Sequence, residues 1–239
     1  MKTIFKLTLK SGVRDPFLLF WSIIIPIGGL IALGHLIKIP QYPSRILTGM
    51  MATSILFYSL VTTAFAVLAN RRRGVYNLLK VTPLPLWKYV LCVSAAWTLI
   101  SFICGTLVLA VGIILFNIPI SVASFLMIIA VILLATIGYV LFSFFIASMG
   151  KNEGQVSMIS NIAILPLMLC SSSFYSLENA PSVLKTISRF NPFQWFVNGL
   201  RSSLEQDLPS FLTNSALLLA VAAGALLLSV RTFRYSEIK

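Results

Sequence analysis

The chain has 239 residues, of which 58% are hydrophobic and 10% are charged, and its mean hydropathy is +0.96. Soluble domains are about 45–50% apolar and about 25% charged, so one globular core cannot hide this much apolar surface. The composition excludes a soluble enzyme and predicts a single membrane domain over residues 1–239. The net charge of +12 does not indicate nucleic-acid binding, because no basic segment carries the aromatic pattern or fold signature for it.

Residues 1–16 are the first predicted element, an amphipathic helix that lies flat in the membrane interface. Basic residues recur at every fourth position: Lys2, Lys6, Lys10 and Arg14. This spacing places them along one side of a helix, roughly opposite Ile4, Phe5 and Leu9. Such a helix would keep its cations near anionic lipid. The alternative is a disordered basic tail.

Six apolar runs follow, and each is long enough for the ~20 residues that a membrane-spanning helix needs. They are residues 17–37, 46–69, 89–116, 121–149, 156–174 and 211–230. None contains Asp, Glu, Lys or Arg. Six spans put both termini on one side, where 13 of the 18 Lys and Arg lie. The excess of positive charge predicts that this side is cytoplasmic, in a multi-pass protein of the cell membrane.

The loop of residues 70–88 is more than a connection between the second and third spans. Three arginines at positions 71–73 precede Gly74, and the apolar residues after it are spaced as on one side of a short helix. Pro83 ends this helix. We expect the arginines to lie near acidic lipid or acidic partner residues. The alternative is a loop whose charges only set the orientation of the chain.

Residues 175–210 form the predicted outer segment, with two short helices. Pro181 can start the first helix, Asn191 can cap the second, and Pro192 fits its first position. Apolar residues then repeat with helical spacing: Phe193, Phe196, Val197, Leu200 and Leu204. A helix of roughly twelve residues cannot cross a bilayer, so it is re-entrant or rests on the outer surface.

Polar residues inside the spans concentrate in the second and fifth. The candidates are Ser54, Tyr58, Thr62, Ser157 and Asn161. Such groups either hold helices together or line a pathway. The spans contain no acid, the single histidine is His35, and no cysteine has a ligand partner at metal-binding spacing. We therefore expect no metal site and no catalytic residue in this chain.

Two motifs resemble those of the type-2 ABC exporter permeases, also called ABC-2 membrane proteins. One is RRRGVYNLLKVTPLP at residues 71–85, and the other is NPFQWFVNGLR at residues 191–201. The resemblance extends to the whole layout. It implies an all-α integral membrane protein with six transmembrane helices, an interfacial N-terminal helix, a cytoplasmic coupling helix and short re-entrant helices before the sixth span.

The resemblance also implies partners and roles. A permease of this kind works with a second, identical or homologous permease copy and with two copies of an ABC ATPase, which bind ATP and Mg²⁺. This chain has no phosphate-binding loop of its own. The ATPase-coupling residues would be Gly74, Val75, Leu78, Leu79 and Pro83. The second and fifth spans would line the substrate pathway. The external gate would comprise Asn191, Pro192, Phe196, Val197 and Leu200.

Three other functions compete with an exporter of amphipathic or lipid-like molecules. An intramembrane enzyme lacks its catalytic set here. A carrier driven by an ion gradient, or a channel, is the main alternative, but such carriers usually have ionisable residues within their spans. A non-transporting assembly factor would explain the spans but not the two motifs.

Overall fold

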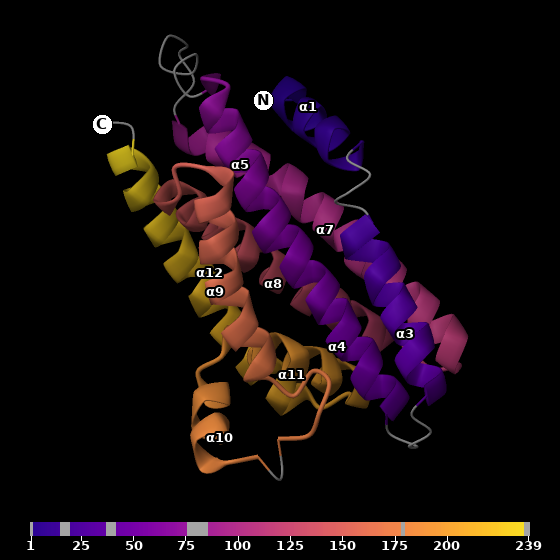
Figure 1. Ribbon diagram of the computed structural model, residues 1–239. Helices are drawn as coiled ribbons and strands as arrows, with labels where there is room; N and C mark the ends of the chain where they lie inside the picture. The colour runs from indigo at the N-terminus through magenta and orange to yellow at the C-terminus, as the bar shows by residue number, and fades with distance from the viewer. Residues whose placement is uncertain (1, 15–19, 37–41, 76–85, 178–179, 237–239) are drawn as a thin grey trace.

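The computed structural model describes residues 2–14, 20–36, 42–75, 86–177 and 180–236, and the elements in these ranges are all helical. Figure 1 shows them as a bundle. In chain order they are α1 (Lys2–Val13), η1 (Phe20–Ile24), α3 (Ile25–Leu36), α4 (Tyr42–Leu56), η2 (Phe57–Thr62), α5 (Thr63–Arg72), α7 (Leu86–Phe116), α8 (Val122–Met149), α9 (Glu153–Leu169), α10 (Ser182–Arg189), α11 (Pro192–Glu205) and α12 (Leu208–Ser236).

Four helices within the described ranges are long and apolar enough to cross a membrane: Tyr42–Arg72, Lys88–Phe116, Val122–Met149 and Leu208–Ser229. Two shorter apolar helices, Ser22–Gly34 and Glu153–Leu169, occupy the positions of the predicted first and fifth spans. An apolar helix is thus present at every predicted span, while six full crossings remain a prediction. Both termini lie at one end of the bundle, and α10 and α11 lie at the other (Figure 1).

Helix α8 is the centre of the bundle and packs against α12, α11, α7 and α5. Its contact with α12 is close because both helices present small residues. Gly138 faces Ala222, and the Ser229 hydroxyl donates to the carbonyl of Leu141. Small residues and hydroxyls allow helices to approach closely in lipid, where burial of apolar surface gives no drive for association.

The predicted second span is one rod built from α4, η2 and α5. It begins at Tyr42 and ends at Arg72, a few residues beyond the predicted 46–69 at each end. Its middle, η2, is wound as a π-helix. Segments of π-helix are rare and often lie at functional sites. Two of the candidate pathway residues, Tyr58 and Thr62, belong to η2.

Helix α1 (Lys2–Val13) lies within the predicted N-terminal element of residues 1–16. Its lysines are exposed, and Ile4 and Leu9 pack against the core. Gly12 is buried and accepts a hydrogen bond from the hydroxyl of Tyr58 at 3.4 Å. The helix is therefore attached to the bundle by both apolar contact and a hydrogen bond to the second span.

The predicted fifth span is shorter than expected, and its predicted end at residue 174 is wrong. Helix α9 ends at Leu169, and residues 171–173, three serines that we call the serine turn, follow as a non-helical segment. Gly49 of α4 lies directly against the backbone of Ser173. The hydroxyl of Ser171 also bonds that of Ser173 at 2.7 Å, so these side chains stabilise a turn rather than a further helical turn.

The contact at Gly49 gives a prediction. A Cβ there would overlap the carbonyl oxygen of Ser173, so Gly49→Ala should separate α4 from the serine turn and destabilise the fold by about 1–3 kcal/mol. Gly28→Ala is the matched control, because a Cβ at Gly28 meets nothing within 4 Å. Thermal unfolding in detergent compares the two. Equal midpoints for both variants would contradict the close packing.

Candidate coupling and outer gate sites

The end of α5 marks the start of the candidate coupling loop. Gly74 has φ +70°, a conformation that favours glycine and ends the helix, and its N–H donates to the carbonyl of Arg71 at 3.1 Å. Val75 is half-buried and packs against the core. The other predicted coupling residues, Leu78, Leu79 and Pro83, lie outside the described residues.

Two of the three arginines bind the turn between α8 and α9. Arg71 donates from Nη1 to the carbonyl of Ala147 at 3.2 Å and from Nη2 to the carbonyl of Gly150. These carbonyls end α8, so a cation there satisfies free acceptors and opposes the negative end of the helix dipole. We call the contact of Arg71 with Ala147 and Gly150 the α5–α8 joint.

The neighbouring arginine adds a weaker link. Arg72 Nη1 lies 2.9 Å from Glu153 Oε1, in the first turn of α9, and both side chains are exposed. An exposed pair of this kind contributes at most about 1 kcal/mol. The sequence pattern suggests lipid or partner acids for all three arginines, but Arg71 and Arg72 find their partners within the chain. In the sequence, Gly150 after a long apolar run indicates the end of a helix, whose free carbonyls need donors such as Arg71.

The candidate pathway residues of the second span are buried within the subunit. Ser54 donates to the carbonyl of Ser22 in η1, which ties the second span to the first. Tyr58 bonds Gly12 and packs against Trp97 with ring centroids 6.0 Å apart. Thr62 is also buried. These contacts join helices, and the pathway role of the three residues stays a prediction.

The candidates of the fifth span lie differently. Ser157 is half-buried, whereas Asn161 is exposed. Asn161 shares its side of α9 with exposed apolar residues at helical spacing: Met158, Ile162, Leu165 and Leu169. This side of α9 is therefore an apolar surface with one amide in it, turned away from the bundle.

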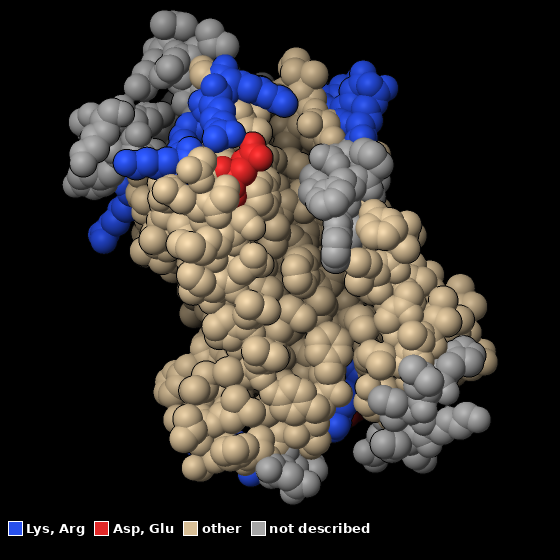
Figure 2. Space-filling model, viewed as in Figure 1, with Lys and Arg blue, Asp and Glu red and all other residues tan. Residues whose placement is uncertain are grey.

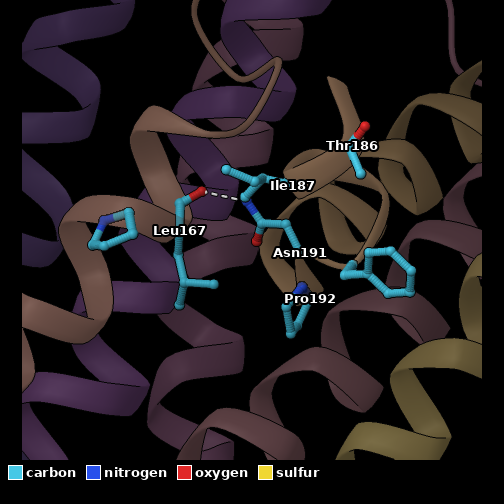
Figure 3. A pocket seen from close by; sticks show the side chains of 7 residues that line it. Leu167, Thr186, Ile187, Asn191 and Pro192 are labelled. Atoms are coloured by element: carbon cyan, nitrogen blue, oxygen red, sulfur yellow. Dashed lines mark hydrogen bonds between the residues drawn. The ribbon is translucent and has the colours of Figure 1, made fainter. Parts of the chain in front are cut away.

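Asn191 connects the outer helix α11 to the end of α9. Its Oδ1 accepts from the N–H of Phe193 at 2.9 Å, which caps α11 as predicted. Its Nδ2 donates to the carbonyls of Leu167 at 2.7 Å and Cys170 at 3.0 Å. Figure 3 shows Asn191 pointing at Leu167, with Pro192 beside it at the first helical position. The amide of Asn191 thus supplies an acceptor to the first turn of α11 and a donor to the carbonyls at the end of α9.

On the predicted apolar side of α11, Leu204 is half-buried and the other four residues are buried. Phe196, Val197 and Leu200 have no exposed surface. The Phe196 ring meets Tyr139 of α8 edge-on, with centroids 6.1 Å apart. Helix α11 packs against α8, α12 and α4, so it is inserted between helices of the bundle rather than resting on their surface.

The polar side of α11 is hydrogen-bonded to the serine turn. Gln194 accepts from the N–H of Ser172 at 2.6 Å and donates to its hydroxyl at 2.9 Å. Arg201 donates to the same hydroxyl at 2.6 Å and to the Ser172 carbonyl. Burial, and to a lesser degree nearby Arg45, lower the pKa of Arg201 to about 10, while Glu205 opposes the shift. Arg201 remains charged near neutral pH.

A profile of the ABC-2 type transporter family matches residues 1–204, which include both motifs, the joint and most of α11. The chain belongs to this family of membrane permeases.

Named relatives are more distant. The chain is 26% identical over 141 residues to the "Probable multidrug ABC transporter permease YbhR" of Escherichia coli K12, covering 58% of this chain and 38% of that protein. It is 23% identical over 234 residues to the "Putative transport permease YvfS" of Bacillus subtilis, covering 96% and 95%. It is 25% identical to the "Putative transport permease ycf38" of Porphyra purpurea, covering 81% and 66%. The chain therefore spans less than two fifths of the length of the Escherichia coli relative.

The α5–α8 joint predicts unequal effects of two neighbouring substitutions. Arg71→Gln leaves the end of α8 without its cation and should lower the free energy of unfolding by about 1–3 kcal/mol. Arg72→Gln removes only an exposed pair and should cost less than about 1 kcal/mol. Unfolding of the two purified variants measures both, and an equal loss would show that Arg71 is no more than a surface charge.

The double role of Asn191 can be separated with a nearly isosteric change. Asn191→Asp keeps an oxygen for the Phe193 N–H but replaces the donor to α9 with an anion facing two carbonyls. We expect a loss of about 1–3 kcal/mol. Asn152→Asp is the control, because Asn152 caps α9 through its Oδ1 and is exposed. If both variants unfold at the parental temperature, the bond between α11 and α9 contributes nothing to stability.

Proposed function

We propose that this chain is the membrane-spanning permease subunit of an ATP-driven exporter. Family membership supports the assignment as a permease subunit. The α5–α8 joint supports a mechanism in which the loop after α5 couples the permease to an ATPase. Arg71 fixes the end of α5, which the loop leaves at Gly74, to the turn between α8 and α9. Force applied to the loop would move α5, α8 and α9 together, as coupling to an ATPase requires.

The ATPase is a separate polypeptide that docks on the loop through Leu78 and Leu79, ahead of the break at Pro83. Two ATPase copies bind ATP and Mg²⁺, and this chain supplies no catalytic group. The 13 to 5 distribution of basic residues supports a cytoplasmic position for the loop and both termini in the cell membrane. Figure 2 shows blue side chains gathered at the end of the bundle that carries the termini.

Transport takes place between two permease copies, identical or homologous. The exposed side of α9, with Asn161 among apolar residues, faces the second copy and the pathway. Ser157 lies on the same helix, and Ser54, Tyr58 and Thr62 of the second span would contribute the other polar groups of the pathway. An apolar surface with isolated amides and hydroxyls suits an amphipathic or lipid-like cargo such as a drug or peptide. Helix α11 closes the outer end, where Asn191, Pro192, Phe196, Val197 and Leu200 hold it against α9 and the core.

The test combines partner capture with transport. A tagged chain purified gently from native membranes should carry an ATP-binding protein that contains a phosphate-binding loop. Membrane vesicles with the cytoplasmic side outward should accumulate an amphipathic dye only when ATP is added. Replacing Leu78 and Leu79 by Asp should remove both activities without preventing membrane insertion. Leu208→Asp, an exposed leucine at the start of α12, is the control. Full ATPase binding and full export by the double variant would refute the docking role.

A further inference from the structure

A groove separates α1 from α5 at the end of the bundle that carries the termini. It has a volume of about 530 Å³, within the range of small-molecule sites, and Figure 2 shows this face hollowed between the two helices. Helix α1 packs on α7, which forms the floor. Leu7 and Thr8 of α1 line one wall, Phe65 and Ala66 of α5 line the other, and Trp97 of α7 lies at the base.

The base of the groove is closed by the indole of Trp97, which is 3% exposed. Leu7 is 63% exposed in one wall of the groove. The groove therefore offers an apolar surface that the chain itself leaves open.

The rim of the groove is basic. Arg73 and Asn70 line it, and Arg73 is exposed and forms no ion pair with a described residue. The one acid in the lining, Glu153, is already held by Arg72 at 2.9 Å. A ligand that reaches this rim meets a net positive charge, which favours an anionic group there.

We infer that this groove binds one molecule of an anionic phospholipid. An acyl chain would lie along Leu7, Phe65 and Ala66 over the Trp97 ring, and the phosphate would lie at Arg73. The apolar depth of the groove and the cation at its rim match the two ends of such a lipid. The inference does not depend on the direction of transport or on the cargo.

Brominated lipids test the groove, because bromine on an acyl chain quenches a nearby indole. The full chain is purified in detergent, and brominated phosphatidylglycerol or phosphatidylcholine is added at low molar ratio. The signal from Trp97 is the difference between the parent and Trp97→Phe. We expect saturable quenching of this signal, with about fivefold tighter binding of phosphatidylglycerol.

Two further variants locate the lipid. Arg73→Gln should remove the preference for phosphatidylglycerol, whereas Lys151→Gln, an exposed cation that does not line the groove, should retain it. Ala66→Leu, or Thr8→Phe if the first variant does not fold, should fill the groove and abolish quenching by both lipids. Equal binding of the two lipids, equal effects of the two charge variants, or quenching that survives the filled groove would each overturn the inference.

Discussion

Backbone carbonyls at the ends of helices must find donors inside the bundle, because lipid offers none. Helices α8 and α9 end where the chain turns, and in each case a side chain from another helix supplies the donors. Arg71 of α5 serves the end of α8, and Asn191 at the start of α11 serves the end of α9. The positions of the second span and of the outer helix both depend on these two bonded ends.

Helix α9 is held at both of its ends by residues from other parts of the chain. Glu153 in its first turn pairs with Arg72, and Leu167 in its last turn is bonded by Asn191. Its 17 residues span ~25 Å, so it extends through much of the bundle. A displacement of α5 at one end of α9 would therefore be transmitted to α11 at the other end through a single short helix.

Apolar runs and residue spacing were sufficient to predict that apolar helices occur at these positions and that residues 2–13 are helical, since both follow from local composition. The Asn191 cap and the apolar side of α11 were predictable for the same reason. The partners of these groups were not. The bond from Asn191 to Leu167 joins positions 24 apart, and that from Arg71 to Gly150 joins positions 79 apart. Such distances in the chain leave no periodic signal. The early end of α9 was missed because Cys170 and the serines after it are compatible with an apolar helix. Two of the residues that bind the serine turn, Gln194 and Arg201, are 22 and 29 positions away from Ser172.

The π-helical winding of η2 determines the direction in which the later residues of the second span point around the helix axis. Each residue of an α-helix turns the chain by ~100°, and a π segment holds more residues in the same length. Ser54 precedes η2 and faces Ser22, whereas Arg71 follows it and faces the end of α8. If η2 rewound from a π-helix into a regular α-helix, Arg71 would rotate about the helix axis by about a quarter of a circle, away from the carbonyls that it binds. Six residues in the middle of the second span therefore determine the direction in which its basic end points, and rewinding all six as an α-helix would misalign that end while leaving the hydrophobicity of the span unchanged.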